Sequence, residues 1–213
     1  MEASEFFELG YKKQTEKDFK GAIKFYDNAI EKDESFEKAY IQRAFCNFQL
    51  NEFKNALQDY RTAIKLNSKD AVTFLNAGYL TYKLNENIKD VSLLNKAIEL
   101  DSKNMAEAYF IRGIIYKNSK LYESAIQDFT KAIELNFACK TSLLNRGICH
   151  LELKNFDNAF LDFEKAAQLN PNNDSDTCFA YLLMGNIKQK EGKNEEALLY
   201  YTKAKEIDPN FKI

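Results

Sequence analysis

Residues 106–139 have the sequence AEAYFIRGIIYKNSKLYESAIQDFTKAIELNFAC, in which two runs of helical periodicity are separated by a polar break. In each run, large and small apolar residues recur at spacings of three and four, which places them on one face of a helix. These residues are Tyr109, Gly113 and Tyr116 in the first run, and Ala125, Phe129 and Ala132 in the second. The stretch therefore predicts a hairpin of two helices that pack together through these faces.

The same 34-residue pattern occurs six times, and its units span residues 3–36, 37–70, 71–104, 106–139, 140–173 and 178–211. When each unit is numbered from its first residue, position 27 is always alanine, position 8 is Gly or Ala, and position 24 is a large residue. The residues at position 8 are Gly10, Ala44, Gly78, Gly113, Gly147 and Gly185, and those at position 24 are Tyr26, Tyr60, Leu94, Phe129, Phe163 and Tyr201. Small residues let the two helix axes come close, and large residues fill the space beside them.

Turn-forming residues such as Asn51, Asn85 and Gly192 occupy positions 15 and 16, between the two helices of a unit. A single hairpin of this kind cannot bury its own apolar face, so consecutive units are expected to stack on one another. The sequence thus predicts an all-α protein of about twelve helices.

This pattern closely resembles that of the tetratricopeptide repeat (TPR) family, and the resemblance covers residues 3–211. It implies a right-handed α-solenoid of six helix-turn-helix repeats that forms a single domain. It also implies a non-catalytic scaffold whose partner is a protein or a peptide, held in a concave groove that the first helices line.

The composition of the 213-residue chain supports a non-catalytic role. A single histidine, a net charge of −2 and a pI near 5.7 argue against a histidine-rich metal site and against a basic nucleic-acid-binding domain. Nucleotide-binding and hydrolase motifs are absent from the sequence, and His150 falls at an ordinary packing position. We therefore expect no enzyme activity, cofactor, metal site, nucleic-acid partner or membrane association, and a cytoplasmic location.

Two charged positions vary together across the six units. Position 7 is arginine and position 23 is aspartate in the same three units, whereas the other units have uncharged residues at both positions. The resulting pairs are Arg43 with Asp59, Arg112 with Asp128, and Arg146 with Asp162. This covariation predicts a bidentate ion pair between the two helices of a unit. The alternative is that the three arginines bind an anion together.

The resemblance implies that positions 2, 5, 9, 12 and 13 face the groove, and positions 5, 9 and 12 are rich in apolar and aromatic side chains. The candidate groove residues are Phe7, Tyr11, Ile41, Phe45, Phe48, Leu75, Tyr79, Tyr82, Phe110, Ile114, Leu144 and Ile148. An exposed apolar strip of this size usually marks a partner site. In the alternative interpretation, adjacent first helices cover one another and little of the strip is exposed.

Two further features are specific to single units. In the third unit Asp90 stands where all five other units have alanine, and Asn87 and Leu94 stand where most of the other units have aromatic residues. These changes predict a local shift or kink in the second helix. In the last unit we expect Tyr201, Ala204, Ile207 and Phe211 to be uncovered, because no helix follows them in this sequence. Such an end favours a second function, a self-associating adaptor that contacts partners, or another copy of itself, through its C-terminal repeat.

Overall fold

A computed structural model describes residues 1–86, 89–169 and 175–210, and these residues form twelve α-helices and no strand. In chain order the helices are α1 (Ala3–Thr15), α2 (Phe19–Lys32), α3 (Glu37–Gln49), α4 (Phe53–Lys65), α5 (Ala71–Lys83), α6 (Ser92–Leu100), α7 (Ala106–Asn118), α8 (Tyr122–Glu134), α9 (Cys139–Glu152), α10 (Phe156–Leu169), α11 (Ser175–Lys190) and α12 (Asn194–Ile207). The predicted all-α class and the number of helices are confirmed. Among the described helices, none combines the length and the apolar content needed to cross a membrane.

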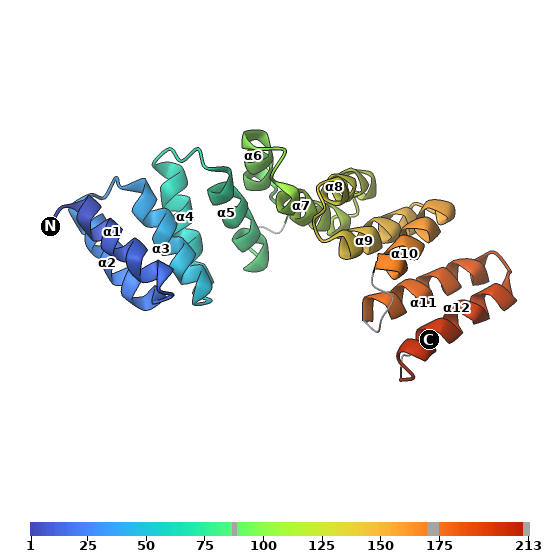
Figure 1. Ribbon diagram of the computed structural model, residues 1–213. Helices are drawn as coiled ribbons and strands as arrows, with labels where there is room; N and C mark the ends of the chain where they lie inside the picture. Colours follow the sequence, from blue (N-terminus) through green and yellow to red (C-terminus); the bar gives the residue numbers. More distant parts are fainter. Residues whose placement is uncertain (87–88, 170–174, 211–213) are drawn as a thin grey trace. The chain divides into compact units, whose positions relative to one another are not determined.

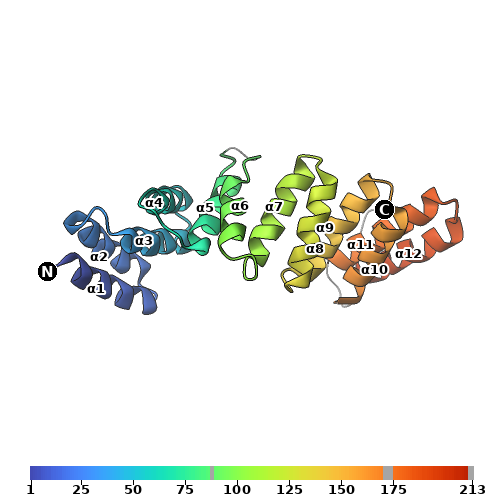
Figure 2. The ribbon, with the colours of Figure 1, turned by 90° about the horizontal axis from the view of Figure 1, so that it is seen from above.

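The chain divides into two compact units, residues 1–108 and residues 109–213. In the first unit each helix from α1 to α5 packs against the next one along the chain, as Figure 1 shows for α1 with α2 and for α3 with α4. In the second unit the same succession runs from α8 to α12, and Figure 2 shows α8 beside α9 from above. Each unit is therefore a stack of helix hairpins.

The turn inside each hairpin has the same backbone conformation in all six repeats. Position 15 is left-handed, with φ between 56° and 76°, at Lys17, Asn51, Asn85, Lys120, Lys154 and Gly192. The residue after it donates a backbone hydrogen bond to the carbonyl five residues earlier, as Glu52 does to Asn47 at 2.8 Å. This is the Schellman arrangement, which satisfies carbonyl groups at the end of a helix.

The pairing of a small residue at position 8 with a large one at position 24 is confirmed. A Cβ atom added to Gly147 would lie 2.5 Å from Cε1 of Phe163, and one added to Gly10 would lie 2.7 Å from Cε1 of Tyr26. Tyr26 and Phe163 are fully buried, as are the six alanines at position 27. The large side chain of the second helix thus packs directly against the backbone of the first helix.

The third repeat differs from its neighbours in the start of its second helix. Helix α6 begins only at Ser92, and Asp90 is exposed and accepts a hydrogen bond from the Ser92 backbone N–H at 2.9 Å. Leu94 is nevertheless fully buried against Gly78. The predicted local departure is therefore a shortened helix with Asp90 outside it, whereas Asn87 lies outside the described residues.

The expectation for the last repeat is wrong for Ala204, which is fully buried. Positions 24 and 27 face the first helix of the same repeat, so Tyr201 covers Gly185 and its hydroxyl donates to the Asn186 side chain at 2.9 Å. The exposed apolar residues of α12 are Leu198 and Leu199 instead, at 65% and 54% exposure. Ile207 is half-buried, and Phe211 lies outside the described residues.

Candidate functional site

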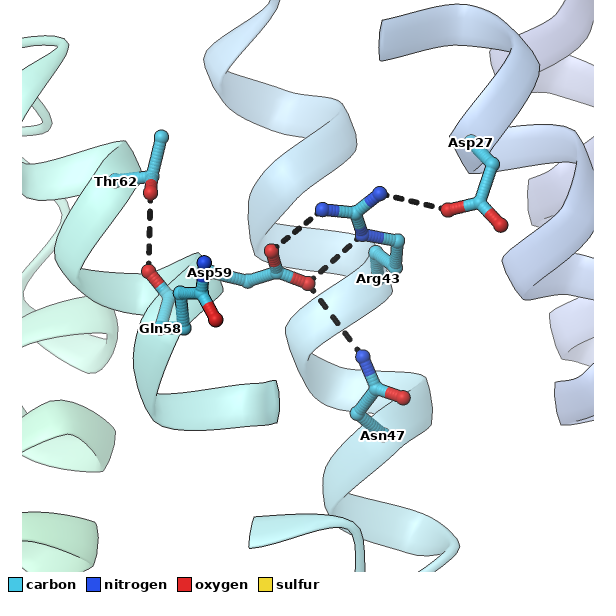
Figure 3. A network of polar contacts seen from close by, with 6 residues as sticks. All are labelled: Asp27, Arg43, Asn47, Gln58, Asp59 and Thr62. Atoms are coloured by element: carbon cyan, nitrogen blue, oxygen red, sulfur yellow. Dashed lines mark hydrogen bonds and ion pairs between the residues drawn. The ribbon is translucent and has the colours of Figure 1, made fainter. Parts of the chain in front are cut away.

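Each arginine at position 7 lies against the aspartate at position 23 of its own repeat. Arg43 donates from Nε to Oδ2 of Asp59 at 2.8 Å and from Nη2 to Oδ1 at 2.6 Å, as Figure 3 shows. The corresponding pairs of distances are 2.8 and 2.7 Å for Arg112 with Asp128, and 2.8 and 2.6 Å for Arg146 with Asp162. All three are bidentate contacts between the two helices of one hairpin.

Arg43 and Arg146 each make a third contact that sequence reasoning missed. Nη1 of Arg43 donates to Asp27 of the preceding repeat at 2.6 Å, and Nη1 of Arg146 donates to Thr130 of the preceding repeat at 2.9 Å. Asp27 and Thr130 both occupy position 25 of their repeats. A polar residue at position 25 ahead of a repeat with arginine at position 7 is the sequence signal for this bond between repeats.

The ion pairs are surrounded by protein, which explains how they affect protonation. Burial opposes the charge of Arg43, but the hydrogen bonds and charges of Asp59 and Asp27 outweigh it and raise the pKa of the guanidinium. The side chain of Asp59 is 7% exposed. Because the donors of Arg43 and Arg146 already meet protein acceptors, these arginines hold hairpins together and leave little capacity to bind an anion.

The candidate groove residues fall into three classes of burial. Leu75 and Leu144 are buried, at 7% and 5% exposure, and Tyr11 and Phe45 are exposed, at 48% and 37%. The remaining residues are half-buried, namely Phe7, Ile41, Phe48, Tyr79, Tyr82, Phe110, Ile114 and Ile148. Ten of the twelve candidates are therefore at least partly covered, and Tyr11 and Phe45 are the exposed ones.

Aromatic neighbours account for much of this covering. The ring of Phe7 lies 5.6 Å from that of Tyr26 and 5.1 Å from that of Phe36, measured between centroids. The ring of Phe48 lies 6.1 Å from that of Tyr79. Such edge and tilted contacts are favourable between aromatic rings, so these residues serve the packing of the stack.

Tyr11 and Phe45 line one hollow in the first compact unit, and its volume is about 310 Å³. Its walls come from α1, α3 and α5, which are the first helices of three consecutive repeats. Tyr60 of α4 and Asp70, the residue before α5, complete the lining. The lining residues are Tyr11, Gln14, Ile41, Gln42, Phe45, Tyr60, Asp70, Val72, Thr73 and Asn76. We refer to this site as the α1–α3–α5 hollow.

Val72 was not among the predicted groove residues, although it is 49% exposed in this hollow. It stands at position 2 of the third repeat, which the family resemblance also places on the groove side. Together with Tyr11 and Phe45 it gives the hollow three exposed apolar side chains from three different helices.

The polar side chains of the hollow form an oriented network. Gln14 donates from Nε2 to Oε1 of Gln42 at 2.9 Å, while its own Oε1 accepts from the hydroxyl of Tyr26 at 2.8 Å and from the thiol of Cys46 at 3.3 Å. Because Gln42 uses Oε1 here and its Nε2 donates to no described residue, Nε2 is available as a donor. The hollow thus offers a hydrogen-bond donor in a fixed position.

Asn76 supplies a hydrogen-bond acceptor to the hollow. Its Nδ2 donates to the Tyr60 hydroxyl at 3.2 Å, and since no described residue donates to its Oδ1, this atom is available as an acceptor. Burial raises the pKa of Tyr60 to about 12, so its hydroxyl stays neutral near pH 7. The Gln42 donor and the Asn76 acceptor match the C=O and N–H groups of a peptide backbone.

The second compact unit contains the single histidine. Burial lowers the pKa of His150, and its buried Nδ1 has no hydrogen-bond partner among the described residues. Within the same described ranges, no group of three or more His, Cys, Asp or Glu residues is placed to hold a metal ion. His150 therefore lies at a packing position, and its Nδ1 makes no hydrogen bond within the described ranges.

Comparison with known protein families agrees with this geometry. The tetratricopeptide repeat model matches residues 37–70, 106–137, 141–173 and 179–211, which together make up more than half of the chain. The repeat with the shortened α6 lies outside these segments. A comparison with curated protein sequences finds no match.

Several solved structures share the fold. YrrB, described as a TPR protein with an unusual peptide-binding site, is 24% identical, with a TM-score of 0.75 over 87% of this chain and 93% of that one. The pilF protein of Pseudomonas aeruginosa is 19% identical, with a TM-score of 0.70 over 98% and 93% of the two chains. MamA from Desulfovibrio magneticus RS-1 is 15% identical, with a TM-score of 0.71 over 83% and 97%. These likenesses establish a helical solenoid of helix hairpins.

Proposed function

Because this chain belongs to the tetratricopeptide repeat family, a fold that supports protein–protein interaction, we propose that it is a non-catalytic scaffold that holds a segment of a partner protein in the α1–α3–α5 hollow. The observation that carries this proposal is the convergence of Tyr11, Phe45 and Val72, all exposed, on one hollow. Exposed apolar side chains that gather in a concavity are typical of binding sites, whereas isolated ones are common on any surface.

The size of the hollow favours a short segment as the occupant. Its volume of about 310 Å³ is at the lower end of the range of roughly 300–1,000 Å³ for small-ligand pockets, which suits a few side chains. The Gln42 donor and the Asn76 acceptor supply hydrogen bonds that do not depend on the side chains of the bound segment. We infer that the partner presents an extended stretch with one or two apolar side chains.

Four cysteines without disulfide bonds fit a reducing compartment, and we propose a cytoplasmic location for this reason.

A second candidate function is self-association through the last repeat. Leu198 and Leu199 favour it, because both are exposed on α12. The partner at this surface would be a second copy of this chain.

One experiment tests the groove and separates the two functions. The wild-type protein is used to select binders from a displayed library of random 12-residue peptides, and the affinity of the selected peptides is measured by fluorescence anisotropy. We expect Tyr11→Ala and Phe45→Ala each to weaken binding about tenfold, since truncating a central aromatic contact typically costs at least 1 kcal/mol. Unchanged affinity in both variants contradicts the proposed site.

Leu198→Ala is the matched control, because it removes an exposed apolar side chain outside the hollow. It should leave peptide affinity unchanged. Self-association is tested by light scattering on the wild type and the same three variants across a dilution series. If the wild type is a dimer and Leu198→Ala is the variant that dissociates, the second function is favoured. If the wild type is a monomer at every concentration, self-association is excluded.

A further inference from the structure

The α1–α3–α5 hollow contains a carboxylate that no cation of the described chain neutralises. Asp70 is exposed at the start of α5, where it accepts from the Thr73 backbone N–H at 2.9 Å and from the Thr73 hydroxyl at 2.6 Å. These donors are uncharged, and within the described residues no lysine or arginine is paired with Asp70. Among the side chains that line the hollow, Asp70 is the charged one.

The exposed rings of the hollow are also free of cations, unlike many rings elsewhere in the molecule. Lys83 places its Nζ 4.1 Å from the ring centroid of Phe53 and 5.4 Å from that of Tyr79. Tyr79 occupies the same position in the third repeat as Tyr11 and Phe45 occupy in the first and second. In the described chain no lysine or arginine covers Tyr11 or Phe45. The ring of Phe45 lies edge to face with that of Phe19 at 6.3 Å between centroids, and the 37% of Phe45 and 48% of Tyr11 that stay exposed can meet a cation from outside.

These two observations concern the same hollow and favour the same charge. The negative face of an aromatic ring attracts an ammonium or guanidinium group, and a nearby carboxylate adds to this attraction. The amide groups of Gln42 and Asn76 carry no charge, so the carboxylate of Asp70 is the formal charge among the side chains that line the hollow. A negatively charged segment would place like charges together at Asp70.

We propose that the segment bound in the α1–α3–α5 hollow carries a lysine or arginine next to its apolar side chain, with the cation held by Asp70 and the faces of Tyr11 and Phe45. This inference rests on the proposed peptide-binding function and adds the charge of the partner. The apolar side chain packs on Val72, and the cation gives the site its preference among apolar segments.

The test uses the full chain and pairs of synthetic peptides taken from the library selection described above. Each pair differs at one residue, with lysine in one peptide and glutamine in the other. We expect the lysine peptide to bind the wild-type protein about fivefold to tenfold more tightly at 50 mM NaCl, and this ratio to fall at 500 mM NaCl as screening increases.

Asp70→Asn is the variant of choice, because asparagine caps a helix as well as aspartate does and removes only the charge. It should bring the ratio of the two affinities below about twofold while leaving the glutamine peptide unaffected. Lys69→Gln, next to Asp70 but outside the lining, is the matched control and should keep the wild-type ratio.

The outcomes separate this inference from the function on which it rests. Selected peptides that are neutral or acidic, yet lose affinity in Tyr11→Ala and Phe45→Ala, overturn the cationic preference and leave the groove in place. A ratio that persists in Asp70→Asn also overturns it. Peptides whose affinity does not depend on Tyr11 or Phe45 overturn the proposed function itself.

Discussion

Repeats 37–70 and 71–104 follow one another in the chain and have the same length, yet their second helices differ. Helix α4 extends over Phe53–Lys65, whereas α6 extends only over Ser92–Leu100. Both helices nevertheless place a large buried side chain, Tyr60 or Leu94, at position 24 opposite a small residue. The comparison shows that both hairpins keep this packing contact, whereas the length of the second helix can change without losing it.

The residue at position 20 favours the later start of the second helix in the third repeat. Position 20 is Ala56 in the second repeat, which is fully buried near the start of α4, and Asp90 in the third. Burying a carboxylate without a partner is costly, so the third repeat keeps Asp90 outside the helix, where it accepts from the Ser92 N–H. Hydrogen bonds from the backbone and the side chain of Ser92 lower the pKa of Asp90, so it is charged near pH 7.

The largest effect is therefore expected from transferring this aspartate to the second repeat. Ala56→Asp should lower the free energy of unfolding by about 3 kcal/mol, because the carboxylate must either be buried or pull the first turn of α4 apart. Urea unfolding followed by far-UV circular dichroism measures the loss. Hydrogen exchange should show faster exchange of the amides of residues 56–58 than in the wild type.

Ala56→Ser is the matched control, since a hydroxyl of similar size can bond within the helix. A loss of stability as large as that of Ala56→Asp would mean that size, and not charge, excludes aspartate from this position.

The two repeats also differ in their polar link between helices. The second repeat has Arg43 and Asp59, where the third has Ala77 and Leu93. Asp59→Leu should cost about 2 kcal/mol, because it leaves the Arg43 guanidinium, with 22% of its side chain exposed, without its bidentate partner. The double variant Arg43→Ala/Asp59→Leu copies the third repeat and should recover at least half of this loss.

Urea unfolding of both single variants, the double variant and the wild type completes a double-mutant cycle. Additive losses, with the double variant less stable than either single one, would contradict the view that the third repeat provides an equivalent solution. Such a result would make the ion pair a requirement of the hairpin.

Sequence reasoning recovered the features that each repeat specifies locally. The pairing of Gly147 with Phe163, and the left-handed turn residues such as Asn51, follow from spacing within one unit. The placement of Arg43 beside Asp59 was visible because independent copies of the repeat vary together at the two positions. The six repeats could thus be compared with one another in the way that homologous sequences are compared.

Features that depend on contacts between repeats were predicted less well. Phe48 and Tyr11 belong to the same apolar strip, but Phe48 packs against Phe53 of its own repeat and Tyr79 of the next one, whereas Tyr11 is exposed. The bond from Arg43 to Asp27 also joins two repeats. Such contacts depend on how far each helix of one hairpin reaches over the next, which the spacing of residues within one unit does not determine.

The smallest effect is expected at the exposed link between the two repeats, where Arg61 of α4 donates to Glu86 at 2.8 Å and to the Thr81 hydroxyl at 3.4 Å. Both charged side chains are nearly half exposed, at 44% and 45%, so water already solvates them and their attraction is weak. Glu86→Gln should therefore lower the free energy of unfolding by less than about 0.5 kcal/mol, and the difference should vanish near 1 M NaCl, where charges are screened within roughly 3 Å. Urea unfolding at low and high salt measures it, with Asp59→Leu as the buried counterpart whose loss should persist in salt. A loss above about 1.5 kcal/mol that resists salt would show that Arg61 joins the two repeats as firmly as Arg43 joins the helices of one, because salt screens exposed charges far more than buried ones.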